Sequence, residues 1–159
     1  PPRDRRGRVS LALRRDDALG PAALAMIAGS EGELAALYPP HLRFAFDPEE
    51  LRAARVRFLV AERDAAPVGC GGVAPLARYG ELKRIYVVPA ARGSGVADAI
   101  VAALEGIARA EGLPLMRLET GAASPAAIAF YARMGYRRCA PFGDYAENGS
   151  SVFMEKPLA

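Results

Sequence analysis

The stretch that decides the fold is residues 80–111, GELKRIYVVPAARGSGVADAIVAALEGIARAE. Its β-prone residues 82–88 predict a strand, which Pro89 ends. From Val96 onwards, apolar residues recur at the spacing of one helix face, so a turn with glycines at 93 and 95 leads into an amphipathic helix. The first N–H groups of a helix lack internal partners, and glycine lets a ligand approach the backbone closely. The pattern therefore predicts a phosphate-binding turn, although a glycine turn that binds no ligand would have the same sequence pattern.

The turn does not match two common phosphate motifs. A Walker A loop needs Gly-Lys-Ser/Thr, and the turn has no lysine. A dinucleotide fingerprint would place its third glycine at position 98, where Asp98 would repel a pyrophosphate. What remains is Arg92-x-x-Gly95-x-Ala97, which resembles the acetyl-CoA pyrophosphate loop of the GNAT superfamily of N-acetyltransferases.

Composition bounds the class of protein. The 159 residues are 52% hydrophobic and 25% charged, which favours one soluble globular domain at 9–159 after a flexible basic tail at 1–8. A net charge of +3 with scattered arginines argues against nucleic acid as a partner. Cys70 and Cys139 form no C-x-x-C pair, so we expect no metal and a reduced, cytoplasmic location. No apolar run approaches the roughly 20 residues of a membrane span, so we expect no membrane partner.

The rest of the chain predicts alternating strands and helices. The expected strands are residues 8–14, 57–62, 67–77, 82–88, 115–120, 136–140 and 151–156. The expected helices are residues 18–28, ended by Gly29, 30–37, a short one starting after Asp47, 96–111, and 126–134, capped by Ser124. The strand–helix–strand unit around 96–111 predicts a right-handed crossover between parallel strands. Glycines at 69, 71 and 72 predict a bulge or close packing. The helical insertion after the first strand either grips a substrate or merely covers the sheet.

A second motif strengthens the resemblance. Residues 124–136, SPAAIAFYARMGY, resemble the closing motif of the GNAT superfamily, about 30 residues after the turn, with Ser124 where many members have Asn. Residues 80–89 and 151–156 are similar to a small bacterial, YsnE-like branch. The resemblance implies the GNAT fold, an α/β (α+β) fold. Its mixed central sheet has about six to seven strands, splayed between the fourth and fifth, with helices on both faces.

The resemblance also implies an enzyme that moves acetyl from acetyl-CoA to a primary amine of a small molecule by direct attack in a ternary complex. Tyr131 stands where the family's tyrosine protonates the departing sulfur; from the residues alone it would be a core tyrosine. The cofactor-binding residues that the resemblance implies are the main chain of Ile85, Tyr86 and Val87, the turn Arg92, Gly93, Ser94, Gly95, Val96 and Ala97, and then Ser124 and Tyr131.

Glu81 is the predicted general base, acting directly or through water. Glu81 starts the fourth strand and, by alternation, shares a face with Lys83, Ile85 and Val87; the alternative is a solvated strand end. Glu119, which closes the fifth strand, is the competitor and otherwise a substrate-binding residue. Lys83 and Arg84 are unusual in mid-strand, and either pair with Glu81 and Glu119 or attract a carboxylate on the acceptor.

Tyr38 and His41 are the further substrate-binding candidates, both in the insertion. Three alternatives to the small-molecule acetyltransferase stay open: a non-catalytic acyl-CoA sensor, acetylation of a protein amine, and an unrelated phosphate-binding protein. The sequence leaves open whether the protein is a homodimer.

Overall fold

The computed structural model describes residues 10–159, so the predicted tail at 1–8 lies outside the described residues. A seven-stranded sheet has the order β1-β2-β3-β4-β5-β7-β6. Its strands are β1 (Ala12–Arg15), β2 (Arg57–Arg63), β3 (Ala66–Pro75), β4 (Gly80–Val87), β5 (Leu115–Gly121), β6 (Arg137–Arg138) and β7 (Ser151–Pro157). The helices are α1 (Pro21–Leu37), η1 (Pro40–Leu42), α2 (Pro48–Ala53), η2 (Pro89–Ala91), α3 (Val96–Ala110) and α4 (Pro125–Arg133).

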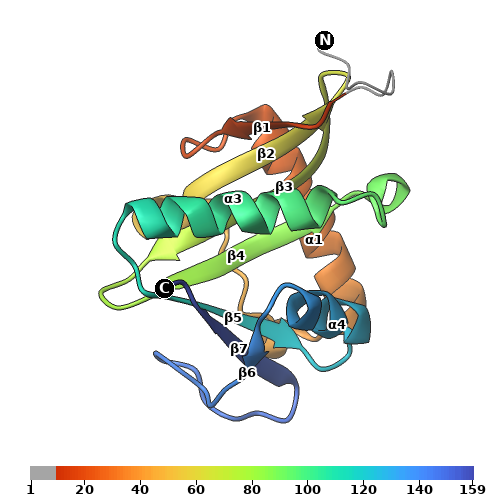
Figure 1. Cartoon of the computed structure of the whole chain (residues 1–159). Helices are drawn as coiled ribbons and strands as arrows, with labels where there is room; N and C mark the ends of the chain where they lie inside the picture. The colour runs from red at the N-terminus through yellow and green to blue at the C-terminus, as the bar shows by residue number, and fades with distance from the viewer. Residues whose placement is uncertain (1–9) are drawn as a thin grey trace.

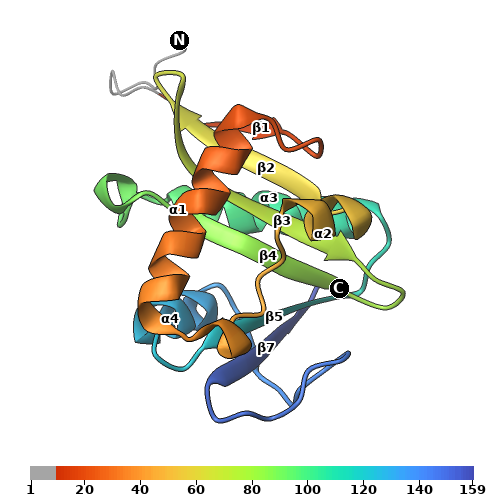
Figure 2. The same ribbon diagram turned by 180° about the vertical axis from the view of Figure 1, so that it is seen from behind.

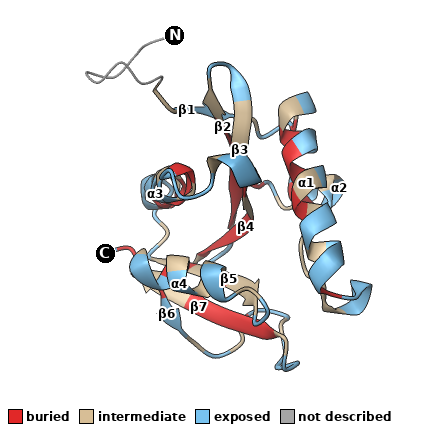
Figure 3. Ribbon diagram, turned by 90° about the vertical axis from the view of Figure 1, so that its right-hand side faces the viewer, coloured by how far each residue is buried: buried red, intermediate tan, exposed pale blue. Residues whose placement is uncertain are grey.

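Helices cover both faces of the sheet, as the sequence predicts. Helix α3 crosses one face (Figure 1), and α1 and α2 cross the other (Figure 2). Viewed along the edge, the sheet lies between them, and buried residues line the inner sides (Figure 3). Strand β2 shows why both faces fill: Phe58 and Val60 pack in the α1 cluster, while Leu59 and Ala61 pack in the α3 cluster. The alternation of a strand thus feeds two hydrophobic layers.

The sheet opens between β4 and β5. These strands are parallel, as the crossover through α3 predicts, but only Gly80 with Met116 and Glu81 with Arg117 are paired. Along its other edge, β5 pairs with β7 over its whole length, from Leu115 to Gly121. The stretch of β4 after Glu81 therefore has a β3 neighbour but no β5 partner. The predicted splay is confirmed.

A bulge changes the faces that β4 presents. The pairing of β3 with β4 shifts by one residue between Cys70 and Gly72, opposite Arg84, whose φ of 57° is left-handed. Glu81 and Lys83 share a face, but Ile85 and Val87 pack in the α3 cluster on the opposite face. The prediction that all four share one face is wrong, because simple alternation does not allow for the extra residue.

Some predicted boundaries were also wrong. Residues 18–28 and 30–37 are not two helices: α1 runs unbroken through Gly29 and Ser30. A Cβ at Gly29 would come 2.8 Å from the Tyr86 hydroxyl, so this glycine serves close packing rather than termination. The strand predicted at 136–140 shortens to the two residues of β6. Ser124 begins α4, but its side chain makes no capping hydrogen bond.

Candidate active site

The turn that leads into α3 has the backbone of an anion-binding site. Gly93 and Gly95 lie in the left-handed region, with φ of 73° and 85°, and a Cβ on either would meet no atom within 4 Å. Val96 opens the helix with its side chain buried in the core, so the helix offers a ligand the backbone N–H groups of its first turn. The left-handed positions explain why this turn needs glycine.

Two arginines flank this turn. Arg63, at the end of β2, donates from Nη1 to the Ser94 hydroxyl at 2.9 Å. Arg92 donates from Nε to the carbonyl of Val87 at 2.9 Å and pairs with Glu33 on α1. Arg63 therefore brings a positive charge to the turn, whereas the charge of Arg92 is met by Glu33. Sequence reasoning missed Arg63, because nothing in its local sequence shows that the β2–β3 turn folds beside residue 94.

A cavity of about 150 Å³ occupies the opening between β4 and β5. Leu82 and Ile85 line it from β4, and Leu118 and Glu119 line it from β5. Tyr131 of α4 closes one side. The splay therefore creates a space whose walls include backbone of β4 without a strand partner.

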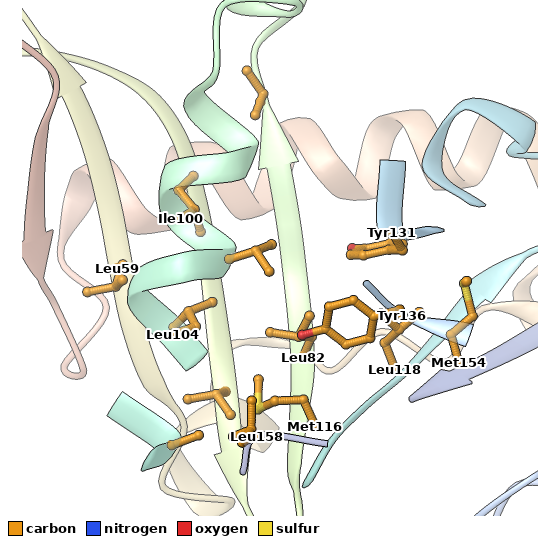
Figure 4. Packing of buried hydrophobic residues seen from close by; sticks show 14 of the residues in the cluster. Leu59, Leu82, Ile100, Leu104, Met116, Leu118, Tyr131, Tyr136, Met154 and Leu158 are labelled. Carbon is orange, nitrogen blue, oxygen red and sulfur yellow. The ribbon is translucent and has the colours of Figure 1, made fainter. Parts of the chain in front are cut away.

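Tyr131, the residue predicted to be the acid, lines the cavity from α4. Figure 4 shows its ring beside the gap, with its hydroxyl end toward β4. The ring packs against Phe130 and Tyr136, with centroids 5.1 and 5.8 Å away. Burial raises the pKa of the Tyr131 phenol, and the charge of Glu119 adds to the effect. At neutral pH this phenol keeps its proton, as a proton donor must.

Glu119 faces the same cavity from the end of β5. Its pKa is raised above the ordinary 4.5 chiefly by desolvation; a hydrogen bond with Ser151 and the charge of Lys83 oppose the shift. A carboxylate with a raised pKa is a better proton acceptor near neutral pH than an ordinary one. Glu81 is the other carboxylate that lines this cavity.

That other carboxylate, Glu81, belongs to a closed polar cluster. Lys83 Nζ lies 2.8 Å from Glu81 Oε1, and the Tyr145 hydroxyl donates to the same oxygen at 2.6 Å. Lys83 also donates to the Tyr145 oxygen at 3.0 Å and lies 4.0 Å above the Phe46 ring. The predicted pairing of Lys83 with Glu81 is confirmed. Tyr145, from the loop before β7, is a site residue that sequence reasoning missed, because a long loop carries no periodic signal.

Arg84 takes a different partner from those predicted. Its Nε donates to the carbonyl of Phe46 at 2.9 Å, and its Nη2 pairs with Glu31 of α1 at 2.9 Å, not with Glu81 or Glu119. Arg43 pairs with the second oxygen of Glu31 at 2.6 Å. Both arginines line the cavity. A left-handed arginine costs roughly 1 kcal/mol or more, so the rest of the fold holds Arg84 in this conformation.

A larger groove of about 1260 Å³ adjoins the cavity. Phe44, Tyr79 and Arg117 are among its walls, and Glu81, Lys83 and Tyr145 line both spaces. The polar cluster therefore stands at the boundary between them.

The other predicted residues separate into two groups. Tyr38 and Ser124 line the cavity, and the Tyr38 hydroxyl accepts a hydrogen bond from the N–H of Ala123 at 3.1 Å. His41 is exposed on η1 and lines neither space. The structure therefore brings Tyr38, Ser124, Glu119 and Tyr131 together but leaves His41 outside.

A splayed sheet with a glycine turn at the helix start and a tyrosine beside the gap defines an acyl-CoA-dependent acyltransferase fold. A sequence profile described as the Acetyltransferase (GNAT) family matches residues 18–136. The chain belongs to this family, and its enzyme class is the acyltransferases.

Individual relatives agree. The chain is 37% identical over 151 residues to an "IAA acetyltransferase" of Azospirillum brasilense, which covers 94% of this chain and 99% of that protein. It is 30% identical to the uncharacterized N-acetyltransferase YsnE of Bacillus subtilis (strain 168), over 92% of this chain and 99% of the relative. The YsnE-like resemblance is thereby confirmed.

Solved structures share the fold. A candidate acyl-CoA N-acyltransferase from Klebsiella pneumoniae has a TM-score of 0.78 and 32% identity, over 94% of this chain and 98% of that one. The PaiA N-acetyltransferase of Thermoplasma acidophilum, solved with coenzyme A, has a TM-score of 0.73 and 20% identity, over 93% and 99%. None of the helices within residues 10–159 has the length and apolarity that a bilayer span needs.

Proposed function

We propose that this protein transfers acetyl from acetyl-CoA to the primary amine of a small molecule, by direct attack with both substrates bound. The observation that carries the proposal is the cavity between β4 and β5, which brings a raised-pKa carboxylate and a buried phenol to one space. The adjoining groove reaches that space from another side, so two substrates can meet there.

The residues present fit acetyl-CoA. The turn at Gly93 and Gly95 and the first turn of α3 would hold the diphosphate, with Arg63 adding positive charge. Main-chain groups of β4 at residues 85–87 would pair with the pantetheine amides, because β5 does not pair with that part of the strand. The Val87 carbonyl would first have to release Arg92. Bound there, acetyl-CoA supplies a thioester whose C–S bond breaks as the amine nitrogen bonds to the carbonyl carbon.

Each side chain then has one proton to move. Glu119 accepts the proton that the amine nitrogen loses on attack, directly or through water. Tyr131 donates its hydroxyl proton to the departing sulfur and recovers a proton from solvent. A backbone N–H of β4 can stabilise the developing charge on the carbonyl oxygen, an effect of about 3–4 kcal/mol where such a donor has been removed in another enzyme.

Glu119 is favoured over Glu81 as the base for a structural reason. Oε1 of Glu81 already accepts a hydrogen bond from Tyr145 and forms an ion pair with Lys83. Glu119 has a hydrogen bond with Ser151 but no ion pair within 4.0 Å among the described residues. Glu81 then acts mainly to fix Lys83 and Tyr145 at the boundary of the cavity. Replacing each by glutamine separates the roles: Glu119→Gln should lower turnover much more than Glu81→Gln.

The test combines binding and turnover. CoA should raise the melting temperature, and thiol release from acetyl-CoA should be stimulated by at least some members of a panel of small primary amines. Stabilisation by CoA with no turnover on any amine would favour an acyl-CoA sensor. Acetylation of peptide amines alone would favour a protein acceptor. Stabilisation by ATP or NAD but not CoA would contradict the proposal outright.

A further inference from the structure

Two arginines share one carboxylate at the wall of the cavity. Glu31 pairs through one oxygen with Arg84 at 2.9 Å and through the other with Arg43 at 2.6 Å. The Arg84 side chain is only 3% exposed, whereas that of Glu31 is 45% exposed. The pair of guanidinium groups therefore lies on the inner side of this cluster, with the carboxylate toward solvent.

The cluster leaves donors without acceptors. Nη1 of Arg84 and Nε of Arg43 are both buried and have no hydrogen-bond partner among the described residues. Buried polar groups in folded proteins are nearly always paired, so each such atom calls for an explanation. Both arginines line the cavity, and a small movement of either side chain would bring its buried donor to an anion bound there.

The local charge balance points to a monoanion. Two guanidinium groups face one carboxylate, which leaves one positive charge in excess within this cluster. Glu119 offsets this charge over the cavity as a whole when it is ionised, so the excess is local to the two arginines. Lys83 does not add to it, because Glu81 neutralises this lysine at 2.8 Å. The planar fork of arginine matches the two oxygens of a carboxylate. A ligand carboxylate fits both the charge and the geometry of the donors.

Glu119 and Tyr131 line the same cavity as Arg84 and Arg43. We infer that the acceptor is a small amine that also carries a free carboxylate, an amino-acid-like compound, with the carboxylate held by Arg84 and Arg43. The inference rests on the proposed function and adds the chemical class of its acceptor. The bulge contributes directly, because the left-handed backbone of Arg84 turns this side chain toward α1 and away from the α3 face.

The direct test compares matched acceptors. Thiol release from acetyl-CoA is measured with the standard L-amino acids and with the corresponding amino-acid amides, which keep the amine and lose the carboxylate. We expect the best free acid to exceed its amide in kcat/KM by at least about 30-fold, the loss typical of removing one partner of a buried charged pair. Equal rates, faster amides, or turnover confined to amines without a carboxylate would overturn the inference.

Variants assign the effect to the arginines. Arg84→Gln and, separately, Arg43→Gln should reduce the acid-to-amide ratio toward one, mainly by lowering kcat/KM for the acid. Arg43→Gln serves if Arg84→Gln fails to fold. The matched control is Arg137→Gln, an exposed position on β6 outside both spaces, which should keep the wild-type ratio. An unchanged ratio in the Arg43 variant and in a folded Arg84 variant would remove the arginines from acceptor recognition.

A binding measurement separates this inference from the proposed function. In the presence of CoA, the preferred amino acid should raise the melting temperature further, whereas its amide should not. Turnover on amides and simple amines would leave the acetyltransferase intact and refute only the carboxylate site. Loss of CoA binding together with turnover on no amine would instead refute the proposed function.

Discussion

The phenol of Tyr38 occupies the space that a Cβ at Gly121 would fill. Tyr38 follows the last residue of α1, and Gly121 ends β5, so this contact joins the two sides of the sheet opening. The Tyr38 hydroxyl also accepts from the N–H of Ala123 and lies 3.4 Å from the Ser124 hydroxyl. One tyrosine thus ties the end of α1 to the loop that starts α4.

Gly121→Ala should therefore destabilise the fold. The new methyl group must displace Tyr38, and overpacking of this kind costs about 1–3 kcal/mol. In a Tyr38→Ala background, Gly121→Ala should lower the unfolding free energy much less, because the tyrosine ring that the new methyl group would strike is gone. Urea unfolding of all four proteins measures this coupling. As a control, a Cβ at Gly106 in α3 would meet no atom within 4 Å, so Gly106→Ala should not lower stability. The prediction would be contradicted if the losses of unfolding free energy from Gly121→Ala and Tyr38→Ala simply added in the double variant.

Tyr131→Phe should lower kcat by about 100-fold or more, while the affinity for acetyl-CoA stays near the wild-type value. The ring and its packing against Phe130 and Tyr136 remain, and only the proton donor is lost. Steady-state kinetics with a CoA-binding titration checks both halves. Wild-type turnover in the phenylalanine variant would rule out Tyr131 as the acid.

Glu119→Gln should abolish most turnover yet stabilise the protein at neutral and higher pH. The pKa of Glu119 is raised in the folded state, so folding favours its protonated form. The cost of its charge is absent below the ordinary pKa of 4.5 and is fully present above the raised folded value. The variant's gain in melting temperature should therefore appear at pH 8 and disappear near pH 4.

As the proposed base, the same carboxylate should set the acid limb of the pH profile. Because Glu119 must be ionised to accept a proton, kcat/KM should rise with pH through an apparent pKa above 4.5. That limb should be lost from the residual activity of Glu119→Gln. An acid limb that persists in this variant and disappears in Glu81→Gln would assign the base to Glu81.

The glycines of β3 should be intolerant of a side chain. A Cβ at Gly71 would come 2.5 Å from Ile85 Cδ1 and 2.8 Å from Ile100 Cγ2, so Gly71→Ala should cost about 1–3 kcal/mol. Gly32→Ala, on the exposed side of α1, meets nothing within 4 Å and should stabilise by about 0.5–1 kcal/mol. Thermal unfolding should show a lower melting temperature for Gly71→Ala and a higher one for Gly32→Ala. Equal shifts in melting temperature would contradict the packing around Gly71.

The sequence predicts most of the architecture because its strongest patterns are local. The amphipathic face of residues 96–110 and the helix start after Asp47 each depend on residues within a few positions. Gly29 misled the helix prediction, since its reason is a contact with Tyr86, far along the chain. A single-sequence pattern does not distinguish a glycine that ends a helix from one that lets a neighbour approach.

The candidate site divides in the same way. Tyr131 and the turn around Gly95 lie in motifs whose spacing is visible in the sequence. Arg43 and Tyr145 reach the site from loops, and Arg63 reaches it from the last residue of β2. No periodic pattern in the sequence predicts where these three positions lie in space. The faces of β4 after residue 83 could not be deduced either, because one inserted residue at the bulge reverses every later side chain.

The opening between β4 and β5 also has a cost for the protein without its ligand. Beyond two paired positions, the facing sides of β4 and β5 have peptide groups that form no hydrogen bonds between the two strands. These sides therefore resemble the edge of a sheet, although they lie within it. Such edges invite pairing with other chains and hence aggregation. Tyr38 and Tyr131 partly obstruct this one. We therefore expect acetyl-CoA to keep the protein monodisperse as well as to serve as its acetyl donor.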